Sequence, residues 1–188
     1  MLEPSERQLL LKMARDAITA AVNKREYVLP KDLPGNLLQS GASFVTLTKN
    51  GELRGCVGTL SAHQPLYLDT VENARHAAFD DGRFDEVSKE DLGNIHIEVS
   101  VLSIPLPRHL RSTYDVLDML RREKPGLILR YGYHQATFLP QVWEQISGAE
   151  EFLSRLCMKA GLASRAWEDK ETAKKIHYDT YIVQKFEE

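Results

Sequence analysis

Four segments of the chain carry apolar residues at intervals of three and four positions, the spacing that gives a helix one buried face. The sequence therefore predicts helices over residues 5–24, 65–79, 113–122 and 149–160. Ser5 and Gln8 have capping-box spacing at the start of the first helix. Gly82 is expected to end the second helix in a left-handed conformation, and Thr113 to cap the third.

The clearest pair of strands flanks the dipeptide Asn50-Gly51, with SFVTLTK before it and ELRGCVG after it. Asn-Gly favours a two-residue type I′ turn because both positions tolerate a positive φ. Such a turn fixes the register and predicts three opposed pairs: Lys49 with Glu52, Leu47 with Arg54, and Val45 with Cys56. Since side chains alternate along a strand, Arg54 and Cys56 are expected to share one face.

Further strands are predicted where apolar and polar residues alternate, at 95–102, 127–131, 134–140 and 178–186. The second and third of these surround Gly132 and read as another hairpin. Because the strands arrive mostly as hairpins and not in strict alternation with helices, we expect an α+β fold. Its antiparallel sheet would be flanked by helices.

The composition is that of an ordinary globular protein. The 188 residues suffice for one large domain or two small lobes, and 24 Lys and Arg against 27 Asp and Glu give a net charge of −3. That balance disfavours a protein that binds nucleic acid or anionic lipid by bulk charge. Two cysteines 101 positions apart, an N-terminus unlike a signal peptide, and no apolar run of about 20 residues predict a cytoplasmic protein without a membrane segment.

Named catalytic and metal-binding signatures are missing, and the six histidines lack metal-ligand spacing, so no metal site is predicted. Residues 55–58 match the GxxG string of a nucleic-acid clamp, but they fall in a strand and not between helices. Residues 108–130 hold six basic and three acidic residues, a modest patch. Nucleic-acid binding therefore stays a remote alternative.

The segment LRGCVG is the strongest candidate site. Glycines in a strand indicate a bulge or a close approach to the backbone. Arg54 and Cys56 would lie about 7 Å apart along the strand, where a guanidinium favours the thiolate form of a cysteine. The alternative is a buried, inert Cys56 and an Arg54 paired with a carboxylate.

The loop DDGRFDEV, residues 80–87, is the second unusual feature. Asp81 lies at a helix C-terminus, where the helix dipole disfavours negative charge, so Arg83 or Arg54 is expected to offset it. The carboxylates could also gather around Mg²⁺, or the loop could simply be solvated. On the strand 95–102, the side of Glu98 is either a polar pocket wall or a solvent-facing surface.

Five strings in this order, LRGCVG, NARHAAFDDGRF, EVSVLS, FLPQV and FLSRLCMKAGL, resemble the AMMECR domain family. The resemblance spans nearly the whole chain. It implies a single domain over residues 1–188 with a larger and a smaller lobe, whose internal boundary the sequence does not assign. It also implies that the LRGC segment borders a cleft between the lobes.

Residue by residue, the resemblance directs attention to positions in the matching strings: Arg54, Gly55, Cys56, Gly58, Asp81, Arg83, Phe84, Gln141 and Lys159. Members of the family have no resolved biochemical role. Some are encoded beside, or fused to, a Memo-like protein, with a radical S-adenosylmethionine protein nearby, which implies these as partners. Neither the residues nor the resemblance identifies a cofactor.

Two functions from different classes follow. In the first, the LRGC segment binds an anionic small molecule or a carboxylate of a protein partner through Arg54 and glycine N–H groups, with Asp81 and Arg83 shaping the site. In the second, Cys56 is the thiolate nucleophile of an enzyme and Arg54 assists it. No convincing general base is evident in the sequence.

Overall fold

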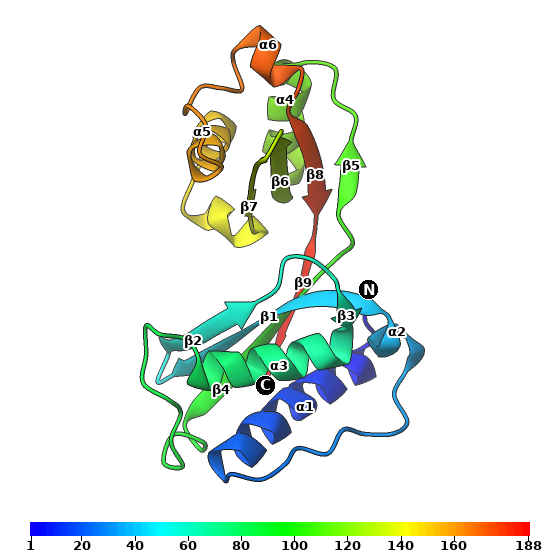
Figure 1. Ribbon diagram of the computed structural model, residues 1–188, viewed down its shortest axis with the longest axis vertical. Coiled ribbons are helices and arrows are strands. Elements are labelled where there is room, and N and C mark those ends of the chain that lie inside the picture. The colour runs from blue at the N-terminus through cyan, green and yellow to red at the C-terminus, as the bar shows by residue number, and fades with distance from the viewer. The chain divides into compact units, whose positions relative to one another are not determined.

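The computed structural model describes residues 1–188 and divides into two compact units. Unit 1 comprises Met1–Ser103 and Gln184–Glu188, and unit 2 comprises Ile104–Val183. Each unit contains one sheet accompanied by helices, as Figure 1 shows, which confirms the α+β class. No helix has the length and apolar character needed to cross a bilayer.

Unit 1 is a five-stranded sheet with two long helices. The strand order is β2-β1-β4-β9, and β3 pairs with the start of β1. Its strands are β1 (Ser40–Lys49), β2 (Glu52–Gly58), β3 (Gln64–Pro65), β4 (Ile95–Leu102) and β9 (Val183–Glu187). Its helices are α1 (Pro4–Val22), α2 (Gly35–Leu38) and α3 (Leu66–Phe79).

Helices α1 and α3 cover one face of this sheet (Figure 1). Val45 and Leu47 on β1 alternate with polar residues and are fully buried against the apolar stripes of both helices. On α3 that stripe is made of alanines, including Ala74 and Ala77, which let the helix approach the sheet closely. The apolar residues that recur every second position in the strand and every three or four positions in the helices therefore pack together in a single core.

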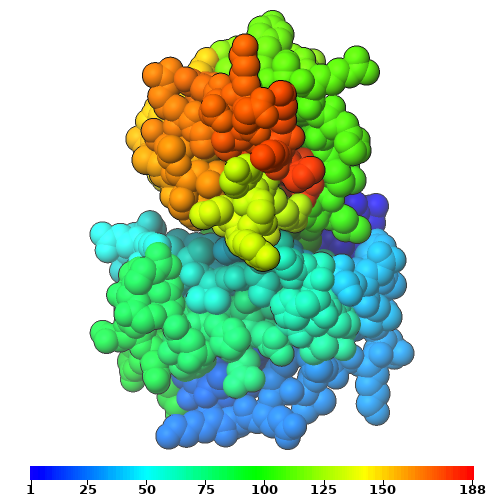
Figure 2. Space-filling view, turned by 45° about the horizontal axis from the view of Figure 1, so that its top comes forward, coloured from blue at the N-terminus to red at the C-terminus, as the bar shows by residue number.

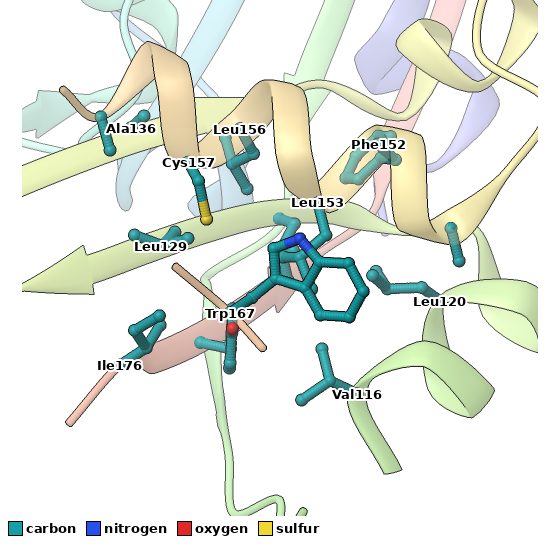
Figure 3. Close-up of a cluster of buried hydrophobic side chains, with 14 of the residues drawn as sticks. Val116, Leu120, Leu129, Ala136, Phe152, Leu153, Leu156, Cys157, Trp167 and Ile176 are labelled. Carbon is teal, nitrogen blue, oxygen red and sulfur yellow. The ribbon is translucent and has the colours of Figure 1, made fainter. Parts of the chain in front are cut away.

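Unit 2 has a four-stranded sheet in the order β5-β8-β6-β7. Its elements are β5 (Leu106–Arg108), α4 (Thr113–Glu123), β6 (Gly126–Tyr131), β7 (His134–Phe138), the 3₁₀ helix η1 (Pro140–Glu144), α5 (Ala149–Lys159), α6 (Lys170–Ala173) and β8 (His177–Tyr181). Figure 3 shows Trp167 and Cys157 among aliphatic side chains of its core. Cys157 is 0% exposed and serves as a small core residue.

Some predicted ends are wrong, because neighbouring residues take the capping role. Helix α1 has Glu3 as its N-cap, and the capping box joins Glu3 to Glu6 in place of Ser5 and Gln8. Helix α4 is capped by Ser112, not Thr113, since the Ser112 hydroxyl accepts the Asp115 N–H.

Two further boundaries differ from the predicted ones. Helix α3 ends with the Asp80 N–H donated to the His76 carbonyl, and Gly82 does not adopt the expected left-handed conformation. The predicted strand 178–186 is divided at Ile182 into β8 and β9, because β8 belongs to the sheet of unit 2 and β9 to that of unit 1.

A buried carboxyl group holds unit 1 together. The side chain of Asp69, on α3, is 0% exposed and is contacted by no cation. Its Oδ2 accepts hydrogen bonds from the Ser43 backbone N–H and hydroxyl on β1, both at 2.7 Å, and from Asn73 at 2.9 Å. Its Oδ1 accepts the hydroxyl of Thr59, just after β2, at 2.5 Å. One side chain thus fixes α3, β1 and the segment that follows β2.

We expect Asp69→Asn to lower the free energy of unfolding by about 3 kcal/mol, because the amide nitrogen would face buried donors and leave them unpaired. Urea unfolding followed by circular dichroism measures this. Asp80→Asn, the same change at an exposed position on α3's end, is the matched control. Equal, small losses for both variants would contradict the assigned role of Asp69.

Candidate functional site

The hairpin of β1 and β2 contains a bulge that changes the predicted register. Lys49 pairs with Glu52 as expected, and Asn50 and Gly51 both have positive φ. Beyond the next pair, however, Leu47 opposes Gly55, so Arg54 is an extra residue without a partner on β1. The predicted pairing of Leu47 with Arg54 is therefore wrong.

The same one-residue shift decides the environment of Cys56. Cys56 lies opposite Thr46 and not opposite the buried Val45, so it points away from α1 and α3. We call this side of the unit 1 sheet the Cys56 face. Cys56 is partly exposed, and the Thr46 hydroxyl lies 3.3 Å from its sulfur.

Cross-strand pairing extends this arrangement into a polar row. Thr46 lies opposite Glu98 on β4, and Glu98 forms an ion pair with Lys185 on β9 at 2.6 Å. Directly opposed residues share a face, so Cys56, Thr46 and Glu98 form one line across three strands. Thr46 was missed by the sequence analysis because only the bulge moves it next to the thiol.

Asp81 and Arg83 cap the free edge of β2. The Cys56 N–H donates to Asp81 Oδ2 at 2.8 Å, and Arg83 Nη2 donates to the Cys56 carbonyl at 3.3 Å. These backbone groups would otherwise be unpaired at an edge strand. Arg83 also grips both Asp81 oxygens, through Nε at 2.9 Å and Nη2 at 2.7 Å.

This ion pair sets the electrostatics of the site. The hydrogen bond from Arg83, followed by that from the Cys56 N–H, lowers the pKa of Asp81 far below its ordinary value. Asp81 chiefly, and Cys56 to a smaller extent, raise the pKa of Arg83. Arg83 is 58% exposed and its Cζ lies 5.3 Å from the ring centroid of Phe84. Arg83 is thus the cation that contacts Cys56, through the backbone carbonyl of that residue.

Arg54 has a different task from the expected one. Its guanidinium donates to the carbonyls of Asp85 and Glu86 and lies 3.6 Å from Asp91. Lys49 pairs with the same Asp91 at 2.5 Å, and this contact more than any other lowers the pKa of Asp91. No contact joins the Arg54 guanidinium to the Cys56 sulfur. Arg54 clamps the segment after α3 onto the hairpin; Figure 2 shows this segment (green) at the surface beside the β1–β2 turn (cyan).

The two glycines of the motif are required for packing. A Cβ on Gly55 would lie 2.0 Å from the Ala77 carbonyl oxygen of α3, so this glycine admits the helix and not a ligand. A Cβ on Gly58 would lie 2.2 Å from the Phe44 ring. Gly58 is in phase with Cys56 along β2, so its N–H points to the free edge.

The remaining candidate residues, Gln141 and Lys159, belong to unit 2. Gln141 on η1 has a buried Oε1 without a hydrogen-bond partner. Lys159, at the end of α5, donates to the Thr137 carbonyl at 2.9 Å and lies over the Phe138 ring. No three His, Cys, Asp or Glu side chains gather in a metal-binding arrangement, so the acidic loop does not form the Mg²⁺ cluster considered above.

The comparisons identify relatives along almost the full length. A family model described as AMMECR1 matches residues 11–186. A protein of Methanothermobacter thermautotrophicus is 40% identical over 177 residues, covering 91% of this chain and 90% of the relative. A protein of Nanoarchaeum equitans is 34% identical over 165 residues, 87% of this chain and 92% of the relative.

A solved structure has the same fold. The crystal structure of the uncharacterized protein PH0010 from Pyrococcus horikoshii matches 100% of this chain and 93% of that chain, with a TM-score of 0.79 and 31% sequence identity. Neither this structure nor the relatives above have names that state an activity.

Replacing Gly55 by alanine is expected to lower the free energy of unfolding by about 3 kcal/mol, because the new methyl group collides with helix backbone that cannot move independently. Gly82→Ala is the control, since nothing lies within 4 Å of a Cβ at that position. Urea titration compares the two, and a Gly55→Ala protein as stable as Gly82→Ala would refute the close approach.

Asp81→Asn should lower the melting temperature at pH 7. In acid, the melting temperatures of the variant and of the wild type should become similar. A carboxyl whose pKa is lower in the folded state contributes stability above its unfolded pKa of about 3.9 and loses it as the pH falls toward the folded value. Thermal melts from pH 7 downward should therefore show the difference from wild type shrinking below about pH 4. A difference independent of pH, like that of Asp80→Asn, would contradict the ion pair's contribution.

Proposed function

The chain belongs to the AMMECR1 family, and from that premise we propose that residues 53–58 form a binding site for a small anionic molecule or for a carboxylate of a protein partner. A Memo-like or a radical S-adenosylmethionine protein is the partner that the family resemblance suggests. In this proposal Arg83 replaces Arg54 as the cation that meets the ligand.

The observation that carries the proposal is that the partly exposed Cys56 lies beside Arg83, whose guanidinium still has N–H groups without a hydrogen-bond partner. The guanidinium has five N–H groups. Asp81 and the Cys56 carbonyl occupy Nε and Nη2, while Nη1 has no partner, and the side chain is largely exposed. Asp81 already accepts two hydrogen bonds from Arg83, and this pre-arrangement reduces the conformational entropy lost when an anion binds.

The backbone adds a second donor. The Cys56 N–H is already taken by Asp81, whereas the edge-facing N–H of Gly58 has no partner within β1. An anion near the end of β2 would therefore meet a charged donor and a neutral one, a combination typical of carboxylate recognition.

A Cys56-dependent enzyme is the second candidate. Its support is the Thr46 hydroxyl, 3.3 Å from Cys56 Sγ, which can donate to a thiolate or accept from a thiol. Here too Arg83, and not Arg54, is the cation in contact with Cys56, through the backbone carbonyl of that residue. The two functions differ in their need for the Cys56 thiol, since the enzyme requires it as the nucleophile and the anion-binding site does not.

Alkylation of Cys56 by two reagents tests the anion site. Iodoacetate carries a negative charge and iodoacetamide does not, but both react with the thiolate, so the ratio of their rates is independent of the thiolate fraction. We expect Arg83→Gln to lower the iodoacetate-to-iodoacetamide ratio about threefold or more, because a local attraction for the anion is lost. Cys157 is buried and should not react in the folded protein.

Arg75→Gln is the matched control, since Arg75 is an exposed arginine of α3 without an ion pair. It removes the same net charge and should leave the ratio unchanged. If Arg83→Gln leaves the ratio as in wild type, or both variants lower it equally, the anion site around Arg83 is refuted.

A further inference from the structure

A second pocket lies entirely within unit 2 and plays no part in the site around Cys56. It has a volume of about 270 Å³ and is bounded by the segment leading into α4, by α6 and by β8. Figure 2 shows the segment before α4 (green) and the region of α6 (orange) side by side on the surface of this unit. Leu110, Val116 and Ile176 give the pocket an apolar floor.

The charged part of its wall is basic. Four of the six basic residues in 108–130 are neutralised by ion pairs: Arg108 with Glu123, Arg121 with Glu150, Arg122 with Asp118, and Arg130 with Asp179. Arg111 is not paired, and it lines the pocket together with Lys170, which also has no ion pair. The one acid on the wall, Glu168, is paired with Arg165 at 2.6 Å.

Tyr178 supplies an independent indication of a ligand. Its side chain is only 6% exposed and lines the pocket, yet its hydroxyl has no hydrogen-bond partner in the protein. Burial raises the pKa of this phenol, so the hydroxyl keeps its proton and can donate it. The hydroxyl oxygen itself keeps some solvent exposure, so a group bound in the pocket can accept its hydrogen bond.

We propose that unit 2 binds a small organic anion in this pocket, a phosphate monoester or a carboxylate that bears one apolar group. The charged end meets Arg111 and Lys170, and the apolar group packs on Val116 and Ile176 within reach of Tyr178. The pocket volume of about 270 Å³ is close to the smallest volumes of known ligand pockets, and it suits a molecule with a single ring.

Amide NMR titration of the full chain tests this with four probes: phenyl phosphate, benzoate, inorganic phosphate and benzyl alcohol. The first two carry both chemical features, and each of the others carries one. We expect at least one aromatic anion to bind about tenfold more tightly than inorganic phosphate, and benzyl alcohol not to saturate. Which aromatic anion binds more tightly distinguishes the phosphate from the carboxylate.

Two variants and a control locate the site. The double variant Arg111→Gln, Lys170→Gln should raise the dissociation constant about tenfold or more, and Tyr178→Phe about threefold or more. Arg122→Gln with Lys124→Gln removes the same charge outside the pocket and should have little effect.

The proposal is overturned if neither aromatic anion saturates, if inorganic phosphate binds as tightly as the better of the two aromatic anions, or if both double variants weaken binding equally. Shifts confined to residues 54–58 and 81–83 would also overturn it, because they would assign the anion to the site in unit 1. The outcome is independent of the Cys56 alkylation result, so the two proposals fail or succeed separately.

Discussion

The candidate site in unit 1 depends on the buried carboxyl group of Asp69. A carboxyl group without a cation is costly to bury unless its oxygens are hydrogen-bonded, and here four donors converge on it, from β1, from α3 itself and from the residue after β2. Because Ser43 belongs to β1 and Thr59 directly follows β2, the helix that bears Asp69 holds both ends of the hairpin that carries Cys56. The position of the thiol is thus set from the core outward.

A second level of organisation comes from the segment after α3. Asp81 and Arg83 satisfy the edge of β2 at Cys56, while Arg54 reaches in the other direction to hold residues 85 and 86. The contacts are reciprocal: the loop caps the strand and the strand clamps the loop. This accounts for several residues of the LRGC and DDGRF strings as structural requirements. The Cys56 thiol, the Thr46 hydroxyl and Nη1 of Arg83 are not used in these contacts, so they remain available to a ligand.

Much of the fold follows from the sequence, while the site follows from it only in part. The long helices and the two hairpins were predictable because amphipathic spacing and the turn residues Asn50-Gly51 and Gly132 are local signals. The choice of Arg54 as the partner of Cys56 failed because it assumed an unbroken ladder. Glycine at position 55 did signal a bulge or a close approach, and both occur there, but it does not tell which residue is extruded.

The sequence by itself determined the class of fold and the family, and it singled out the segment of the candidate cysteine, since these depend on periodicity and on short strings of residues. Only the tertiary structure decided which face Cys56 occupies and which arginine serves it. The physical reason is that a one-residue shift in a strand exchanges its two faces. The contacts that select the shift come from Ala77 on α3 and from Asp81 in the loop beyond it, which lie 22 residues from Gly55 and 25 from Cys56 along the chain.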